Sequence, residues 1–178
     1  MRSQGYTPPE ERHPGWNYMA YRSSLPTDND NIQRVVYSTL LSMGIEPDPK
    51  RADRHAANFG FAGDDSPTIE WVFDTNSYPI LSVVLSPIEG YMQLSTFFGL
   101  EIVRNKGIGR ELLGIAMAEA IGRGHRRFYA ESREVFAAAN HILETSGWRR
   151  GRDLPPGSGA ERTYYLILDE NAETPITG

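Results

Sequence analysis

The sequence contains no cysteine, and this absence removes several kinds of site at once. Without thiols the chain has no disulfide framework, no thiolate zinc site and no cysteine nucleophile. It also has no apolar run near the ~20 residues that a membrane span needs, because the longest candidate, Pro79–Leu85, has the length of a strand. The polar, proline-rich residues 1–15 lack the apolar core of a signal peptide, so we expect a cytoplasmic protein.

A surplus of basic residues is missing as well. The 178 residues include 18 Lys and Arg against 23 Asp and Glu, which gives a net charge of −5. Proteins that bind nucleic acid non-specifically usually have a basic surplus, because contacts with phosphate dominate their affinity. The balance therefore disfavours nucleic acid as the main partner, although the arginine-rich stretches 123–127 and 149–152 leave a local basic patch open.

What the chain does contain fits one globular domain. Hydrophobic residues make up 39% and charged residues 23% of the sequence, a balance that argues against wholesale disorder. No internal repeat is visible, and no linker divides the chain. We expect a domain over residues 16–169, flanked by flexible tails at 1–15 and 170–178. The oligomeric state stays open, including a homodimer.

Hydrophobic periodicity and turn residues predict the strands and helices. The predicted strands are Trp16–Arg22, Thr68–Asp74, Pro79–Ser86, Tyr91–Leu100, Arg127–Glu131, a short strand from Trp148, and Thr163–Leu168. The first helix follows the cap residues Thr27, Asp28 and Asn29 and stops at Gly44, and a second covers Asp48–Asn58.

Two further helices lie in the second half of the chain. One follows a glycine-rich turn, ends at Gly122 and Gly124, and carries the apolar residues Leu112, Leu113, Ala116, Met117, Ala120 and Ile121. The other is capped by Ser132, ends at Gly147, and carries Val135, Ala139, Ile142 and Leu143. Hairpin-linked strands followed by strand–helix alternation predict an α/β fold: a mixed (α+β) sheet with helices on both faces, in the order β-α-α-β-β-β-α-β-α-β-β.

The most informative segment lies between a predicted strand and an amphipathic helix. It reads Arg104, Asn105, Lys106, Gly107, Ile108, Gly109, Arg110. Its two glycines let backbone amides approach an anion closely, and the first helical turn adds unpaired N–H groups and a positive dipole end. The basic side chains add charge, so we predict a pyrophosphate site. The segment matches neither a P-loop nor a complete dinucleotide fingerprint.

Arg104-x-x-Gly107-x-Gly109 resembles the Arg/Gln-x-x-Gly-x-Gly/Ala signature of the GNAT superfamily of acyl-CoA-dependent N-acyltransferases. The predicted element order is similar to that fold, and Gly147-Trp148 resembles the Gly-Phe that begins the family's sixth strand. The resemblance implies an enzyme that moves an acetyl group from acetyl-CoA, or another acyl group from its CoA ester, directly to a primary amine. The acceptor would be a small molecule or a protein, and no metal would be needed.

The resemblance also implies the residues that bind the coenzyme. The backbone of Asn105–Arg110 would hold the CoA pyrophosphate, and the strand before it would separate from its neighbour and pair with the pantetheine arm. The implied coenzyme-binding residues are Phe97, Phe98, Gly99, Arg104, Asn105, Lys106, Gly107, Ile108, Gly109, Arg110 and Asn140. The family's usual Val-x-Pro stretch is replaced here by Gly99-Leu100-Glu101.

For catalysis, the resemblance implies Glu131 as the base. It ends the strand that follows the helix after the glycine-rich segment, and this position is similar to that of the general-base Glu in the ribosomal-protein alanine N-acetyltransferases. The alternative is that Glu131 has only a structural role, because a negative charge is stabilised near the N-terminus of the following helix. Gln93 is a candidate for orienting water. The position of the tyrosine that serves as general acid in the family is occupied here by Leu143. The family's CoA-contacting Asn is either replaced by Phe136 or displaced to Asn140. The substitute acids are Tyr164, which is our prediction, and then Tyr165 and His141.

Two other functions stay open at this stage. The missing tyrosine is compatible with an acyl-CoA-binding module that has lost catalysis. A modifier of nucleic-acid-linked amines, such as aminoacyl-tRNA, would require a continuous basic face next to the acceptor cleft, which the net charge does not predict.

Overall fold

The computed structural model describes residues 19–76 and 78–168 of the 178-residue chain. In this part, seven strands form one sheet in the spatial order β1-β2-β3-β4-β5-β7-β6. The strands are β1 (Met19–Ser23), β2 (Ile69–Thr75), β3 (Tyr78–Ile88), β4 (Tyr91–Gly99), β5 (Arg127–Ser132), β6 (Arg149–Arg150) and β7 (Arg162–Ile167). Neighbouring strands are antiparallel except for β4 and β5, which run parallel. The sheet is therefore mixed, as predicted.

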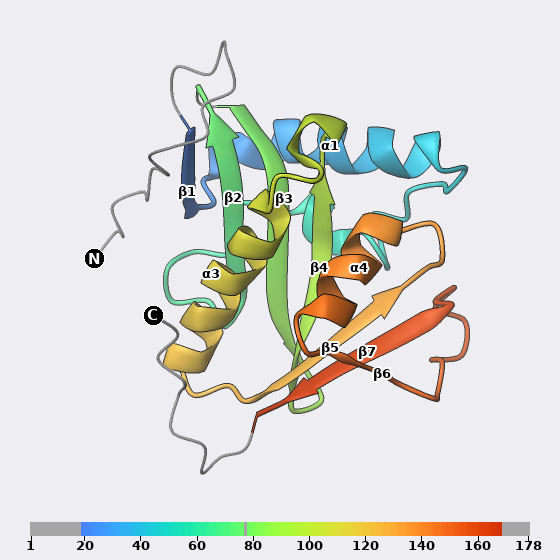
Figure 1. Cartoon of the computed structure of the whole chain (residues 1–178). Helices are drawn as coiled ribbons and strands as arrows, with labels where there is room; N and C mark the ends of the chain where they lie inside the picture. The colour runs from blue at the N-terminus through green and yellow to red at the C-terminus, as the bar shows by residue number, and fades with distance from the viewer. Residues whose placement is uncertain (1–18, 77, 169–178) are drawn as a thin grey trace.

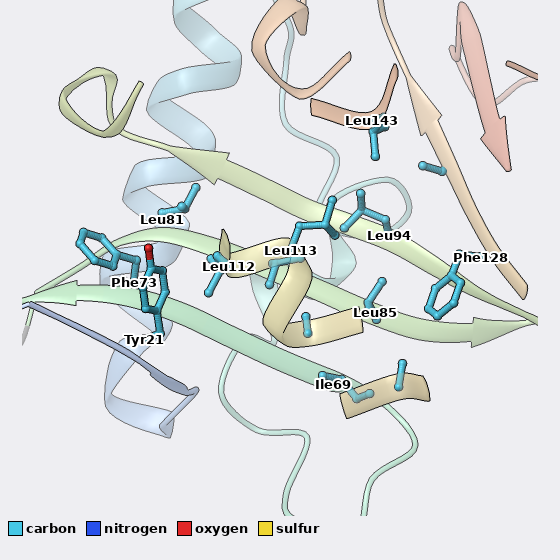
Figure 2. Close-up of a cluster of buried hydrophobic side chains, with 14 of the residues drawn as sticks. Tyr21, Ile69, Phe73, Leu81, Leu85, Leu94, Leu112, Leu113, Phe128 and Leu143 are labelled. Atoms are coloured by element: carbon cyan, nitrogen blue, oxygen red, sulfur yellow. The ribbon is translucent and has the colours of Figure 1, made fainter. Parts of the chain in front are cut away.

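Helices cover both faces of this sheet (Figure 1). They are α1 (Asn29–Ser42), α2 (Arg54–Ala57), α3 (Ile108–Gly122) and α4 (Ala137–Thr145), with short 3-10 turns η1 (Pro26–Asp28) and η2 (Glu101–Val103). On one face, Ile32 of α1 and Ala56 of α2 share a buried cluster with Val84 of β3. On the other, Leu112 of α3 and Leu143 of α4 belong to a larger cluster with the sheet (Figure 2). The predicted element order and layering are both found.

The apolar stripe predicted for α3 faces the core. Leu112, Leu113, Ala116 and Ala120 are each at most 2% exposed, and Figure 2 shows the two leucines between the helix and the strands. Full burial of one leucine contributes about 1.5–3 kcal/mol. Packing of this strength holds α3 against the sheet, and it thereby fixes where the N-terminus of the helix lies relative to β4.

The glycine stop predicted for the first helix is confirmed. Gly44 follows the end of α1 with a φ of 76°, a left-handed conformation that glycine adopts without a steric penalty. The N–H of Ile45 then donates to the carbonyl of Leu40 at 2.9 Å, which satisfies one of the last carbonyls of the helix.

The prediction for the second helix is wrong in length. Only Arg54–Ala57 is helical, whereas helix was expected over Asp48–Asn58. The Asp53 carboxylate accepts a hydrogen bond from the N–H of Asp48 at 2.7 Å, and the N–H of Asp53 donates to the Asp48 carbonyl at 2.8 Å. This side-chain-closed turn competes with the helix and replaces its first part.

Two details of the last helix are also wrong. Ser132 does not cap it, because β5 continues through Ser132, which lies opposite Arg162, and α4 begins only at Ala137. Val135 was expected on the apolar helix face but lies before the helix and is 45% exposed. The connection between β5 and α4 is therefore longer than the sequence indicated.

The expected cap of the first helix differs as well. Asp28 precedes α1, but its carboxylate does not bond to the helix. It accepts two hydrogen bonds from Arg22, both at 2.8 Å, and one from the N–H of Leu25. Arg22 also donates to Asp74 at 2.7 Å, so the group joins η1, just before α1, to strands β1 and β2 at the edge of the sheet. The start of the first predicted strand, residues 16–18, and both predicted tails lie outside the described residues.

Candidate functional site

The sheet opens between its two parallel strands. The pairing of β4 with β5 covers only three residue pairs and ends at Leu94 and Ala130. β4 continues through residues 95–99 and β5 through 131–132 without pairing with each other. This is the separation expected of the strand before the loop at residues 104–110, and it leaves one edge of β4 open next to that loop.

A bulge in β4 lies at the point of separation. Ser95 is opposite Val84, but Phe98 is opposite Ser82, so β4 contains one residue more than β3 over this stretch. Thr96 within the bulge has a φ of 50°, and its carbonyl accepts a hydrogen bond from the Ser82 hydroxyl at 2.7 Å. Since bulges bend a strand and end regular pairing, this bulge accounts for the divergence of β4 from β5.

The loop that follows has the geometry of an anion site. Asn105 and Gly107 have φ values of 60° and 74°, and α3 begins at Ile108. The first N–H groups of a helix have no intrahelical acceptor, and the helix dipole places partial positive charge there. A Cβ placed on Gly107 would meet no atom within 4 Å, so the space beside the turn is open.

The three basic residues of the loop have different surroundings. Within the part of the chain that the structure describes, Arg104 and Lys106 are exposed, and no hydrogen bond or ion pair engages either side chain. Arg110 instead donates to the hydroxyls of Ser146 at 2.8 Å and Thr145 at 2.5 Å. Arg110 therefore links the start of α3 to the end of α4, while Arg104 and Lys106 remain available to an anion.

A cleft of about 430 Å³ joins the loop to the opening in the sheet. It brings together eight of the predicted coenzyme-binding residues: Phe97, Phe98, Gly99, Arg104, Asn105, Gly107, Gly109 and Arg110. Lys106 and Ile108 belong to the same loop but do not line the cleft, and the Ile108 side chain packs against the core. No Asp or Glu lines the cleft, so its charge is basic.

The cleft also contains residues that the sequence did not single out as part of a site. Thr39 of α1 and Met43, just after it, line the cleft together with Leu81, Val103, Val135 and residues 136–139 at the start of α4. Phe136 contacts Phe98 edge to face, with ring centroids 5.3 Å apart, and so connects the segment before α4 to β4. The one signal in the sequence that could have indicated a cleft residue here was that Phe136 occupies the position of the family's CoA-contacting Asn. An apolar wall thus replaces an amide there.

Asn140 does not line this cleft. It is 3% exposed, its carbonyl oxygen accepts from the Ser132 hydroxyl at 2.6 Å, and its amide donates to the Arg133 carbonyl at 2.9 Å. The side chain thus connects the end of β5 to α4. These contacts give Asn140 a structural role, and its predicted contact with the coenzyme has no support in the structure.

Glu131 lies one residue beyond the last pair of β4 and β5, at the opening, but not among the residues that line the cleft. Its neighbours Phe128 and Ala130 belong to the core under α3 and α4, so Glu131 is on the opposite face of the sheet. One carboxylate oxygen accepts a hydrogen bond from the Tyr129 hydroxyl at 3.0 Å.

In β4, the buried hydroxyl of Ser95 has no hydrogen-bond partner among the described residues.

The predicted acid, Tyr164, is fully buried in the core. Its hydroxyl donates to Glu144 at 2.8 Å, and burial raises its pKa. It does not line the cleft, and neither does Leu143, which is 2% exposed. Of the candidates for a proton donor, only His141 lines the cleft, and it is exposed.

Two kinds of feature are absent from residues 19–76 and 78–168. None of their helices combines the length and the apolarity that crossing a membrane requires. Nor do three or more His, Asp or Glu side chains there come together in an arrangement that could hold a metal ion.

No known family model matches the sequence, and no curated protein matches it either. Solved structures do match the fold. A GNAT-family acetyltransferase from Staphylococcus aureus Mu50 has a TM-score of 0.73 and 19% identity, over 85% of this chain and 100% of that one. The PaiA N-acetyltransferase of Thermoplasma acidophilum, in complex with coenzyme A, has a TM-score of 0.69 and 12% identity, over 85% of this chain and 99% of that one.

A third match is the GNAT domain of S. lividans PAT, with a TM-score of 0.65 and 16% identity. It covers 84% of this chain and 90% of that domain. The TM-scores show that all three structures share the fold of this chain. This chain has the fold of the GNAT acetyltransferases, as the resemblance in its sequence implied.

Proposed function

We propose that this protein is an acyl-CoA-dependent N-acyltransferase that moves an acetyl group from acetyl-CoA to a primary amine. The observation that carries the proposal is the cleft that runs from the turn at residues 104–110 to the opening between β4 and β5. A diphosphate suits the amides and the basic side chains of the turn, and an extended amide-containing arm suits the unpaired edge of β4. That a neighbour of the same fold binds coenzyme A supports this reading.

In the proposed reaction, Glu131 takes a proton from the ammonium form of the acceptor, directly or through one water molecule. The neutral amine forms a C–N bond with the thioester carbonyl carbon as the C–S bond breaks, and the nitrogen then loses its second proton to solvent, which leaves a neutral amide. The thiolate leaves and is protonated from solvent or by His141, because thiols of this kind are moderately acidic, with a pKa of about 8.5 by analogy with cysteine. Tyr164 does not enter this scheme, since it does not line the cleft and its hydroxyl donates to Glu144.

A catalytically silent acyl-CoA-binding protein is the second candidate. It is favoured by Leu143, whose buried side chain stands where the family has its acidic tyrosine. The two functions agree in binding acetyl-CoA and differ in whether an amine causes the release of free thiol. Isothermal titration with acetyl-CoA tests binding, and release of free thiol from acetyl-CoA in the presence of L-lysine, spermidine or an alanine-initiated tetrapeptide tests transfer. Binding with amine-dependent thiol release supports the enzyme, binding alone supports the silent protein, and no binding refutes both.

A further inference from the structure

The strand β5 carries a tyrosine two residues before Glu131, on the same face of the sheet. The hydroxyl of Tyr129 donates a hydrogen bond to one carboxylate oxygen of Glu131, with 3.0 Å between the two oxygens. Among the described residues no other hydrogen bond to this carboxylate is found. Tyr129 is therefore the contact that determines where the Glu131 carboxylate points.

The Tyr129 ring is itself held by two neighbouring tyrosine rings. It is 9% exposed and lies opposite Tyr165 of β7, with ring centroids 5.1 Å apart. Tyr91 of β4 contacts both rings, at 6.4 Å from Tyr129 and 5.7 Å from Tyr165. The Arg127 guanidinium lies 4.4 Å above the Tyr91 ring and donates to the Tyr91 hydroxyl. A cluster of three rings from three strands thus fixes the donor.

Tyr129 keeps its proton while it makes this bond. Burial raises the pKa of Tyr129, and the negative charge of Glu131 raises it further. The hydroxyl is consequently a permanent donor near neutral pH, neither acid nor base in the reaction. The bond engages one oxygen of Glu131 and leaves the other free to accept a proton.

We propose that Tyr129 is a positioning residue for acyl transfer, which holds one oxygen of Glu131 so that the other is directed at the acceptor amine beside the opening in the sheet. This inference rests on the proposed function and on Glu131 as its base. A long side chain such as glutamate occupies several staggered rotamers when it is free. Misplacing a reacting group by about 1 Å costs up to about 100-fold in rate, so the loss of this bond should be visible in turnover.

The test compares Tyr129→Phe with Tyr91→Phe, using acetyl-CoA and whichever of the three amines the wild type turns over fastest. Both substitutions preserve the ring contacts, but only Tyr129→Phe removes the hydrogen bond to Glu131, whereas Tyr91→Phe removes the bond from Arg127. We expect Tyr129→Phe to lower kcat about 10- to 100-fold with little change in the KM for acetyl-CoA. Tyr91→Phe should keep kcat within about twofold of the wild type, and both variants should melt as one cooperative unit.

A double-mutant cycle separates positioning from a merely structural effect. If Tyr129 acts only through the carboxylate, adding Tyr129→Phe to Glu131→Gln should not lower kcat below that of Glu131→Gln alone. An additive loss in the double variant would overturn the inference, as would an unchanged kcat in Tyr129→Phe.

The proposed function fails by different results. Full activity of Glu131→Gln would remove Glu131 as the base and the positioning role with it, but would leave transfer in place. A wild type that binds acetyl-CoA and turns over none of the amines would overturn both the transfer activity and this inference. An inactive Glu131→Gln beside a fully active Tyr129→Phe would refute only the role of Tyr129.

Discussion

A tryptophan in place of Gly107 would fill the open space beside the turn at the start of α3. The Cβ would meet no protein atom within 4 Å, so the larger side chain would extend into the cleft without a clash at its root. The φ of 74° at this position belongs to the left-handed region, where a residue with a Cβ is strained. Gly63 offers a matched control, since its φ is 76°, its Cβ would also meet nothing within 4 Å, and it does not line the cleft.

The expected magnitudes follow from this geometry. The left-handed conformation costs a residue with a side chain roughly 1–2 kcal/mol, which in a protein of this size lowers Tm by about 2–8 °C. Both variants should show this loss of stability. Only Gly107→Trp should block the amides at the helix start. Hydrogen bonds to a charged group contribute about 1.5–3 kcal/mol each, so losing two of them should weaken acetyl-CoA binding by about 100- to 10,000-fold.

Isothermal titration with acetyl-CoA and thermal unfolding followed by circular dichroism measure the two effects separately. Gly107→Trp should bind at least about 100-fold more weakly than Gly63→Trp while the two melt within about 4 °C of each other. Equal affinity of the two variants for acetyl-CoA would refute the assignment of the turn as the pyrophosphate site, and the proposed function would lose its main support.

Two further predictions concern stability. Arg22→Met leaves the carboxylates of Asp28 and Asp74, each 2% exposed, without their shared cation. We expect the free energy of unfolding to fall by about 3 kcal/mol and Tm, measured by calorimetry, to fall by about 6–12 °C. As a control, substitution of the exposed Arg34 in Arg34→Met should change Tm little. Burial lowers the pKa of His55 below its ordinary 6.5, so the folded protein binds this proton less readily than the unfolded chain. Its contribution to stability is complete above pH 6.5 and declines as the pH falls through 6.5 toward the lower folded value. Between about pH 7.5 and 5.5 the Tm of the wild type should therefore decrease more than that of His55→Gln, and parallel curves would contradict this account.

The loop at residues 104–110 could be predicted because its signals are local. Two glycines, the basic residues around them and the start of an apolar stripe lie within one short segment, and backbone geometry follows directly from such a segment. The same is true of the stop of α1 at Gly44 and of the strands that alternate in hydrophobicity. The sequence by itself determined the fold class and the order of its elements, and it located the glycine-rich turn that we propose as the anion site.

The tertiary structure decided which side chains meet. Ser132 joined Asn140 in place of capping a helix, and the Tyr164 hydroxyl was directed to the exposed Glu144 of α4. Ser132 and Asn140 are both buried, and their contact prevails over a local cap because burial raises the cost of an unpaired polar group. The contact of Phe98 with Phe136 joins residues far apart in the chain, and the Tyr129 ring that holds Glu131 is fixed by β4 and β7. Partners brought together across strands leave no spacing in the sequence that could have predicted them.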